Sequence, residues 1–278
     1  MSFLTQKQIN EIAIIALKAG KIAKDFFVKK NFTIEKKLDQ SDVTSADIAV
    51  SDFICESLTE VAPNIPIICE EKNKITITGN VFFLIDPIDG TSGYANGKDE
   101  FSVNISLIKD KKPIFGLIYA PIFENGKMFY NEKNKILKYD NLLDKDLHFV
   151  SDNDLSRLKP KYISKPAISK NIALITSQRS HNSDIENFIK QFYPQNTKNK
   201  TIKKTSSAVK FFDLLQGKSN IYAHFNQTME WDTAAGQALV ELIGFKVKEI
   251  DRLNNKFVLK NILEYTKENY INPSFVIS

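Results

Sequence analysis

Apolar side chains near the start of the chain recur every three or four residues, with Lys and Asp between them. From Thr5 to about Lys29 this spacing matches one face of an α-helix, so the sequence predicts an amphipathic helix there. A second helix is predicted from Thr44 or Ser45, which are favourable N-caps, to about Glu60. We interpret the first helix as a structural element.

The apolar stretch Val81–Ile85 runs directly into the turn-forming sequence Asp86-Pro87-Ile88-Asp89-Gly90. The stretch is short and rich in β-branched and aromatic residues, which predicts a strand that is covered on both faces. Asp-Pro and Asp-Gly then favour an abrupt turn. The sequence therefore places two carboxylates, three positions apart, at the end of a buried strand.

Other short segments with apolar or alternating residues, separated by turn sequences, predict further strands. These runs are Phe32–Leu38, Ile65–Ile68, Phe101–Ile108, Ile114–Ala120, Lys127–Tyr130, Ile136–Tyr139, Ile172–Thr176, Thr201–Lys204, Ile221–Ala223 and Phe245–Ile250. Helices are predicted over Asn182–Phe192, Ser206–Gln216 and Trp231–Ile243, and a loop over Ser92–Gly97. Alternating helices and strands, with an antiparallel run in the middle, predict a layered α/β (α+β) sandwich.

The polar stretch Asp144–Lys170 contains Pro160 and Pro166 and has weak periodicity. Such stretches are typical of boundaries between compact units. We therefore expect two halves, residues 1–168 and residues 169–278.

Composition narrows the class of protein. The chain has 278 residues, of which 42% are hydrophobic and 26% charged, as in an ordinary globular protein. No apolar run is long enough to span a membrane, and the start lacks a secretory signal, so we expect a soluble, cytoplasmic protein. Two cysteines make no disulfide framework. The net charge of +5 comes from scattered Lys residues, which favours a small anionic substrate over nucleic acid.

Asp86 and Asp89 are expected to lie close together on a stiff support. At about 4 Å, two carboxylates repel by roughly 4 kcal/mol at an effective dielectric constant of about 20, so a cation is expected between them. Carboxylates and a backbone carbonyl such as that of Ile88 suit Mg²⁺ or Mn²⁺ better than zinc. Gly90 and Thr91 open the next segment, whose N–H groups can hold a phosphate. The alternative is an ordinary acidic turn.

More acids stand where elements begin or end. Glu70 and Glu71 follow the short strand Ile65–Ile68, and Asp47 and Asp232 lie in the first turns of predicted helices. Each has a simpler explanation, as a solvated loop acid or a helix-start charge. The sequence lacks the P-loop, nucleophile-elbow and dinucleotide-binding patterns, so those classes lose their main support.

Four motifs, in order and at a matching spacing, resemble those of the inositol monophosphatase superfamily. They are Val43-Thr44-Ser45-Ala46-Asp47, Glu70-Glu71, Asp86-Pro87-Ile88-Asp89-Gly90-Thr91 and Trp231-Asp232-Thr233-Ala234-Ala235-Gly236. The resemblance covers nearly the whole chain. It implies an αβαβα sandwich, Mg²⁺-dependent hydrolysis of phosphate monoesters and inhibition by lithium.

The resemblance also implies a role for each matching residue. One Mg²⁺ would be held by Glu70, Asp86 and the Ile88 carbonyl. A second would be held by Asp86, Asp89 and Asp232. Asp47 and Thr91 would orient the attacking water, and Glu70 would share a third, weaker ion. Two cations ~3.5–4 Å apart can activate a water and stabilise the leaving oxygen, so no covalent intermediate is required.

Within the superfamily, the second half is most similar to bacterial 3′(2′),5′-bisphosphate nucleotidases. Contacts to the substrate are then implied for Gly90, Thr91, Ser92, Arg179, His181, Ser206, Lys210 and Asp232. Arg179 and Lys210 supply cations for a second phosphate, the alternative being a solvated basic face. Two positions differ from the nucleotidase pattern: His224-Phe225-Asn226-Gln227 replaces the usual Arg-Phe-Gly-Pro, and Ser92-Gly93-Tyr94 replaces Lys-Glu-Phe.

The leading hypothesis from the sequence is a Mg²⁺-dependent phosphatase that removes the 3′-phosphate of adenosine 3′,5′-bisphosphate, a by-product of sulfate activation. One alternative is an inositol-phosphate or sugar-phosphate monoesterase of the same fold. Another is a non-catalytic nucleotide-binding regulatory protein. Members of the superfamily are often dimers, and the strands between Phe101 and Tyr139 are a candidate contact for a homodimer.

Overall fold

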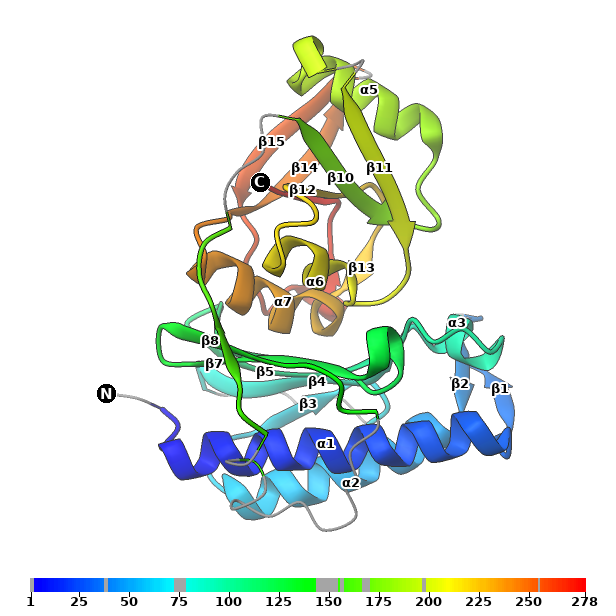
Figure 1. Ribbon diagram of the computed structural model, residues 1–278, viewed down its shortest axis with the longest axis vertical. Coiled ribbons are helices and arrows are strands. Elements are labelled where there is room, and N and C mark those ends of the chain that lie inside the picture. The colour runs from blue at the N-terminus through cyan, green and yellow to red at the C-terminus, as the bar shows by residue number, and fades with distance from the viewer. Residues whose placement is uncertain are drawn as a thin grey trace.

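Five layers of helices and sheets are stacked in the order αβαβα (Figure 1). This computed structural model describes residues 3–37, 40–72, 79–143, 155, 158–166, 171–196, 199–254 and 256–278. From one end of the stack, the layers are helices α1 and α2, a seven-stranded sheet, helices α6 and α7, a six-stranded sheet and helix α5. The layered sandwich predicted from the sequence is therefore confirmed.

The first layer consists of α1 (Gln6–Lys29) and α2 (Ser45–Val61). Each helix begins with a capping box, in which the N-cap side chain and the third helical residue satisfy each other's backbone N–H groups. Thr5 caps α1 and Thr44 caps α2, as the sequence predicts. Gly20 brings α1 close to the sheet, because a Cβ at this position would lie 2.2 Å from the ring of Tyr119.

The seven-stranded sheet has the order β3-β4-β5-β6-β7-β8-β9. Its strands are β3 (Ile67–Cys69), β4 (Val81–Asp89), β5 (Ser102–Lys109), β6 (Lys112–Ala120), β7 (Lys127–Glu132), β8 (Lys135–Tyr139) and β9 (Lys161–Ile163). Strands β3 and β4 are parallel, and the other neighbours are antiparallel. Since Cys69 pairs with Ile85, the parallel pairing brings Glu70 and Asp86 to the same edge of the sheet.

Helices α6 (Lys210–Leu215) and α7 (Glu230–Leu242) fill the space between the sheets. Small residues let α7 approach the first sheet closely: a Cβ on Gly116 of β6 would lie 2.2 Å from the carbonyl oxygen of Ala235. One hydrophobic core joins both halves of the chain, with Phe129 from the first half packed against Phe212 from the second at 4.7 Å between ring centroids. The first turn of α7 is thus fixed over the seven-stranded sheet.

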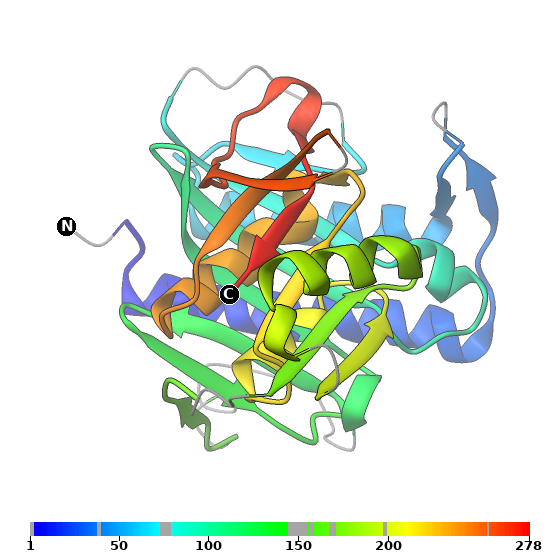
Figure 2. The ribbon, with the colours of Figure 1, turned by 90° about the horizontal axis from the view of Figure 1, so that it is seen from above.

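The six-stranded sheet has the order β11-β10-β12-β17-β14-β15. Its strands are β10 (Ile172–Ser177), β11 (Lys200–Thr205), β12 (Ile221–His224), β14 (Val247–Leu253), β15 (Lys256–Ile262) and β17 (Phe275–Ile277). Strands β11, β10 and β12 run parallel, so their carboxyl ends meet at one edge. Helix α5 (Asn182–Phe192) covers the outer face of this sheet (Figure 2).

Two short two-stranded sheets complete the fold. Strand β1 (Ile34–Lys36) lies in the expected edge strand, but it pairs with β2 (Asp42–Thr44), which the sequence did not predict. Strand β13 (Thr228–Met229) pairs with β16 (Ile271–Asn272) just before α7. Strands β9, β13, β15, β16 and β17 were missed, because most are short and carry no clear alternation.

Two expectations for local structure were wrong. The segment expected to be a loop begins with a short helix, α3 (Thr91–Ala95), which Gly90 allows to start sharply with φ +94°. The helix expected from Ser206 begins only at Lys210, because Ser207 has the left-handed φ of +53°, which an α-helix cannot contain.

The expected boundary at Asp144–Lys170 lies largely outside the described residues. The strands of the seven-stranded sheet come before residue 168, and those of the six-stranded sheet come after residue 169. The division into 1–168 and 169–278 stays a prediction, since the two halves share a core.

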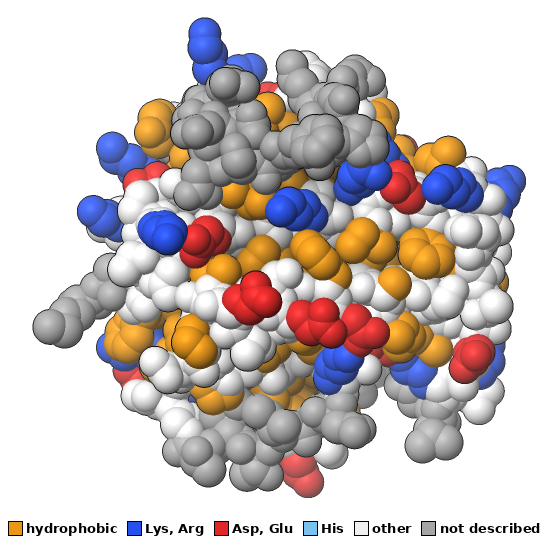
Figure 3. Space-filling model, turned by 90° about the horizontal axis from the view of Figure 1, so that it is seen from below, with side chains coloured by type: hydrophobic (Ala, Val, Ile, Leu, Met, Phe, Trp, Pro, Cys, Tyr) orange, Lys and Arg blue, Asp and Glu red, His pale blue; other side chains and the backbone are white. Residues whose placement is uncertain are grey.

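Among the described residues, no helix is long and apolar enough to cross a membrane. The face formed by α1 and α2 carries side chains of both charges among apolar ones (Figure 3).

Candidate active site

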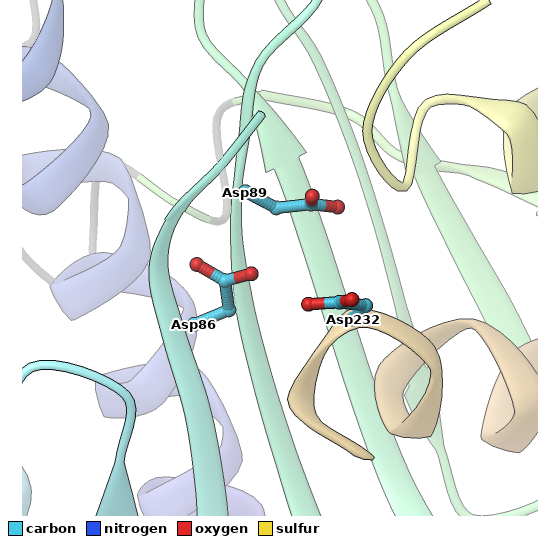
Figure 4. Close-up of side chains that lie close together, drawn as sticks. All are labelled: Asp86, Asp89 and Asp232. Atoms are coloured by element: carbon cyan, nitrogen blue, oxygen red, sulfur yellow. The ribbon is translucent and has the colours of Figure 1, made fainter. Parts of the chain in front are cut away.

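Three carboxylates converge where the first sheet meets α7 (Figure 4). Asp86 and Asp89 come from the end of β4, and Asp232 comes from the first turn of α7. One oxygen from each lies within 4.8 Å of the others. The structure thus brings together the three carboxylates that the resemblance assigns to one metal ion.

An irregularity in β4 explains why two aspartates three positions apart share a side. In a regular strand, residues i and i+3 point to opposite faces. The pairing of β4 with β5 shifts register between Asp86 and Asp89, and this bulge turns both side chains toward α7. The Asp89 carboxylate then accepts hydrogen bonds from the Asn104 amide, at 3.3 Å, and from the backbone N–H of Ala208. Asp232 accepts one from the Met229 N–H at 2.9 Å.

The electrostatics of this cluster favour a bound cation. Burial, followed by the charges of Glu70, Asp89 and Asp232, raises the pKa of Asp86 well above its usual value. Burial and the charge of Asp89 do the same to the pKa of Asp232. Asp86 Oδ1 is buried and has no hydrogen-bond partner among the described residues. An unsatisfied carboxylate oxygen surrounded by acids fits a divalent metal ion, which would neutralise the charge and complete the coordination.

Asp47 and Thr91 meet beside the cluster. Thr91 Oγ1 lies 3.0 Å from Asp47 Oδ1 and 2.9 Å from the Ile88 carbonyl oxygen. Asp47 is held by the capping box, in which the Thr44 N–H and hydroxyl donate to its other oxygen at 2.8 and 2.6 Å. Burial raises the pKa of Asp47. The helix-start acid therefore has a capping role and also faces the site.

Lys37 is a site residue that the sequence did not single out. Its Nζ lies 2.8 Å from Glu70 Oε1 and 2.5 Å from Glu71 Oε1. Burial acts to lower the pKa of Lys37, but the charge of Glu70 and the two hydrogen bonds raise it above its usual value. Burial and Glu70 raise the pKa of Glu71 to about 7. Two adjacent acids at a strand end were the available signal that a nearby cation is needed.

The predicted substrate residues of the second half gather at the carboxyl ends of the parallel strands. Arg179 and His181 follow β10, and both are exposed. Ser206 follows β11, but it is not at a helix start as expected, and its N–H donates to Glu100 at 2.8 Å. Ser207 joins this edge to the first sheet through its hydroxyl, 3.0 Å from that of Ser102.

Gly90 and Ser92 flank Thr91 at the start of α3, where this edge of the second sheet meets the carboxylate cluster. A Cβ on Gly90 would lie 2.9 Å from the Glu100 carbonyl oxygen and 3.1 Å from Ser207 Cβ. Only glycine fits this turn, because the backbone also has a positive φ. The two halves thus contact each other directly at the candidate site.

Lys210 lies deeper than a surface cation. It is only 6% exposed, its Nζ donates to the Ser207 carbonyl, and it lies 5.7 Å from the centre of the Tyr222 ring. Burial lowers the pKa of Lys210, against the opposing charges of Asp89 and Asp232. Its ammonium group therefore balances the aspartates. Its predicted contact with a substrate phosphate stays a prediction.

His224, at the end of β12, is buried and stacks on Phe275 with ring centroids 5.4 Å apart. Burial, with the charges of Lys210 and Arg179, lowers its pKa to about 3. The imidazole is therefore neutral at pH 7. It supplies no positive charge to this edge of the sheet.

The sequence as a whole matches known proteins. The family model for the inositol monophosphatase family matches residues 5–272. The chain belongs to the inositol monophosphatase family. Members of this family are metal-dependent, in agreement with the acidic cluster.

Bacterial 3′(2′),5′-bisphosphate nucleotidases are among the proteins with similar sequences. The 3′(2′),5′-bisphosphate nucleotidase CysQ of Buchnera aphidicola subsp. Acyrthosiphon pisum is 32% identical over 281 aligned positions, covering 98% of this chain and 94% of the relative. The CysQ nucleotidase of Salmonella typhimurium is 30% identical and covers 87% of each. The crystal structure of CysQ from Bacteroides thetaiotaomicron is 22% identical, with a TM-score of 0.76, and covers 99% of this chain and 97% of that one. This last likeness concerns the fold.

Proposed function

We propose that this protein is a metal-dependent 3′(2′),5′-bisphosphate nucleotidase that hydrolyses the 3′-phosphate of adenosine 3′,5′-bisphosphate to give AMP and phosphate. The convergence of Asp86, Asp89 and Asp232 beside the Asp47–Thr91 pair is the observation that carries this proposal. The similarity to CysQ nucleotidases along nearly the whole chain supports the choice of substrate. We expect the reaction to take place in the cytoplasm.

The acids would hold two Mg²⁺ ions, with Mn²⁺ as an alternative. The ligands of the first are Glu70, Asp86 and the Ile88 carbonyl, and those of the second are Asp86, Asp89 and Asp232. When bound, such ions lower the pKa of a water molecule and neutralise charge on the phosphoryl group. A third, weaker ion at Glu70 would compete with Lys37 for that carboxylate.

Thr91 and Asp47 are placed to handle the proton of the attacking water. When the Thr91 hydroxyl donates to Asp47, its oxygen can still accept a hydrogen bond from the attacking water. The raised pKa of Asp47 suits a group that accepts a proton. The water oxygen would then bond to phosphorus while its proton passes through Thr91 to Asp47. The bond between phosphorus and the 3′-oxygen would break, the 3′-oxygen would take a proton from a second water, and Asp47 would release its proton to solvent. Asp47 and Thr91 regenerate without a covalent intermediate.

The second phosphate of the substrate would lie at the carboxyl edge of β10 and β11. There Arg179 offers an exposed guanidinium group, which suits a phosphate through paired charge-assisted hydrogen bonds. His181 and the Ser206 hydroxyl are its predicted neighbours, and Gly90, Thr91 and Ser92 would contact the phosphate at the metals. The carboxyl ends of the parallel strands lie next to the carboxylate cluster at Ser207 and Gly90. One bisphosphate could therefore place one phosphate at the cluster and the other at the strand ends.

The neutral His224 favours a second candidate function, an inositol-phosphate or sugar-phosphate monoesterase. The nucleotidase pattern has an Arg at the position of His224. A neutral, buried imidazole there leaves one cation fewer at the edge that would hold the second phosphate. Phosphate release from adenosine 3′,5′-bisphosphate and from inositol 1-phosphate, measured on purified protein with Mg²⁺, decides between the two. A higher kcat/KM for the bisphosphate is expected. A clear preference for inositol 1-phosphate would contradict the nucleotidase.

A non-catalytic nucleotide-binding protein on this scaffold would bind the bisphosphate without releasing phosphate. The same assay separates this possibility, since it predicts binding at every Mg²⁺ concentration and no turnover. We disfavour it because the chain has the acids that a two-metal mechanism needs: Asp86, Asp89 and Asp232 form one cluster, Asp47 contacts Thr91, and Glu70 lies outside that cluster, paired with Lys37. A homodimer, with the strands between Phe101 and Tyr139 as its contact, stays a prediction.

A further inference from the structure

A closed ring of hydrogen bonds joins Asp89 to the second half of the chain. Asn104 Nδ2 donates to Asp89 Oδ2 at 3.3 Å, and the Ser102 hydroxyl donates to Asn104 Oδ1 at 3.0 Å. The hydroxyl oxygens of Ser102 and Ser207 are 3.0 Å apart. Ala208, which follows Ser207, donates its backbone N–H back to Asp89 Oδ2. The ring therefore begins and ends at one oxygen of a carboxylate in the acidic cluster (Figure 4).

Each hydroxyl in the ring has one proton, which fixes the direction of the hydrogen bonds. Because Ser102 donates to Asn104, the Ser207 hydroxyl donates to Ser102. The side-chain carbonyl of Asn104 is then held toward Ser102, and its NH₂ group is held toward Asp89. In the reversed orientation the amide oxygen would face the Asp89 carboxylate, and the two oxygens would repel each other.

The side chains of the ring are shielded from water. Ser102 is fully buried, Asn104 is 1% exposed and Ser207 is 7% exposed. Ser102 and Asn104 lie two positions apart in β5, so both side chains point to the same face of the sheet. At such positions water does not readily replace a lost donor, and a buried network whose members are all satisfied holds them in one geometry.

Both donors contact the same oxygen of Asp89. Within the described residues, the hydrogen bonds of this carboxylate end on Oδ2, so Oδ1 keeps its lone pairs for a cation. A carboxylate can otherwise turn about its terminal bond, because this torsion has a broad energy minimum. Two donors from different elements remove that freedom, since β5 supplies Asn104 and the loop before α6 supplies Ala208.

We propose that Asn104 is a positioning residue, which Ser102 holds in place so that Asp89 presents Oδ1 to the second metal ion. The inference rests on the proposed function, in which Asp89 is a metal ligand. In this role Asn104 touches neither the metal nor the substrate, and it acts through Asp89. Donors that orient a ligating carboxylate typically contribute about 10- to 100-fold to metal affinity. Losing Asn104 should therefore weaken metal binding without removing a ligand.

Mn²⁺ binding by the full-length protein tests this role without substrate, with free Mn²⁺ measured by electron paramagnetic resonance. Asp89→Asn identifies the sites that depend on Asp89, because it removes the ligand itself. Asn104→Ala is expected to raise the Kd of those sites about 10- to 100-fold. Asn131→Ala is the matched control, because Asn131 is also buried but bonds to backbone groups of β6 instead. Its Kd should equal that of the unchanged protein, although its Tm should fall.

Ser102 is tested by a pair of substitutions. Ser102→Ala removes the hydroxyl that orients Asn104 and should raise the same Kd, whereas Ser102→Thr keeps the hydroxyl and should restore it. Ser106→Ala is the control on the same face of β5, since the Ser106 hydroxyl donates to the Leu84 carbonyl at 2.8 Å and lies outside the ring. In steady-state assays, Asn104→Ala and Ser102→Ala should need more Mg²⁺ for half-maximal activity and should approach the kcat of the unchanged protein at saturating Mg²⁺.

Two results would overturn the inference. One is an unchanged Kd in folded Asn104→Ala, and the other is an equal rise of the Kd in Asn131→Ala. Far-ultraviolet circular dichroism checks that the variants are folded. If Asn104→Ala does not fold, the Ser102 pair decides, and equal Kd values for Ser102→Ala and Ser102→Thr would overturn the inference. An unchanged protein that binds Mn²⁺ but releases no phosphate would contradict the proposed function instead, and the Kd values would still decide the role of Asn104.

Discussion

Thr91 Oγ1 lies 3.0 Å from Asp47 Oδ1, although the two residues are 44 positions apart in the chain. The hydrogen bond joins the short helix after β4 to the first turn of α2. Both residues are fixed independently, Asp47 by the capping box with Thr44 and Thr91 by its contact with the Ile88 carbonyl. The pair is therefore ready for a water before any substrate binds.

Replacing Thr91 tests this arrangement. Thr91→Val keeps the shape of the side chain but removes the hydroxyl, so kcat is expected to fall about 10²- to 10⁴-fold, the usual contribution of a positioned proton-transfer group. Thr91→Ser keeps the hydroxyl and should retain most of the activity. Steady-state kinetics at saturating Mg²⁺ provide the measurement. Similar kcat values for the valine and serine variants would show that the hydroxyl takes no part in the reaction.

Asp89→Asn and Asp232→Asn test the second metal site. Each removes a negative charge with little change in size, so turnover is expected to be abolished. The metal-free variants should fold and be at least as stable as the unchanged protein, since the clustered carboxylates repel one another. Denaturant unfolding and phosphate release measure the two effects. Near-normal turnover of either variant at saturating Mg²⁺ would show that the site is misassigned.

The raised pKa of Asp86 predicts how pH affects the metal-free protein. A carboxyl group whose pKa is raised by folding stabilises the protein while protonated, and this stability is lost as the pH rises from the ordinary value of 3.8 through the folded value. His224, whose folded pKa is about 3, acts oppositely, because stability falls as the pH drops below 6.5. The difference in unfolding free energy between Asp86→Asn and the unchanged protein isolates Asp86.

The free energy of unfolding of Asp86→Asn should exceed that of the unchanged protein by an amount that grows as the pH rises above about 4. Urea unfolding with a chelator present measures this difference. In the unchanged protein, Mg²⁺ affinity should rise over the same range, because protons must leave the carboxylates before a metal binds. Calorimetric Mg²⁺ titrations at several pH values measure the affinity. A difference that is constant with pH would mean that Asp86 has an ordinary pKa.

Lys37→Met tests the cation that the sequence left unassigned. Removing its charge leaves Glu70 and Glu71 facing each other, so the metal-free protein is expected to lose about 1–3 kcal/mol of stability. Mg²⁺ should restore more stability to this variant than to the unchanged protein, since the ion replaces the lost charge. Lys36→Met is the matched control, because Lys36 is exposed and pairs with Asp42 instead. Equal Mg²⁺-induced shifts in Tm for the two variants would exclude this role.

Arg179 and Lys210 are expected to respond differently to the number of phosphates on the substrate. Arg179→Met should lower kcat/KM for adenosine 3′,5′-bisphosphate about 10- to 150-fold, because losing a charge-assisted hydrogen bond costs roughly 1.5–3 kcal/mol. The kcat/KM for a nucleoside monophosphate should change little. Lys210→Met should lower the activity on both substrates, because the buried ammonium balances Asp89 and Asp232.

The sequence alone suggested Lys210 as a cation for the second phosphate, and the burial of its side chain favours the other role. Parallel assays of the two variants on the two substrates separate the possibilities. A loss confined to the bisphosphate in Lys210→Met would restore the first interpretation. Equal losses on both substrates in Arg179→Met would remove Arg179 from the site of the second phosphate.

Local sequence determined the main elements. The helical period of the first segment, the Thr44 cap and the buried strand before Asp86 each depend on neighbours within a few positions, and each appears in the structure as expected. The four acidic motifs were visible for the same reason, because acids at the ends of buried elements stand out against the apolar pattern.

Contacts between distant segments were decided by the tertiary structure. The bulge that turns Asp86 and Asp89 to one side depends on pairing with β5, and the burial of Lys210 and His224 depends on how the second sheet packs over α7. Lys37 lies in the strand expected over Phe32–Leu38, where nothing marks it as a site residue, and it reaches Glu70 because a separate hairpin brings it to the end of β3. Charge, burial and pKa at these positions depend on residues of other elements, which the pattern of neighbouring positions does not specify.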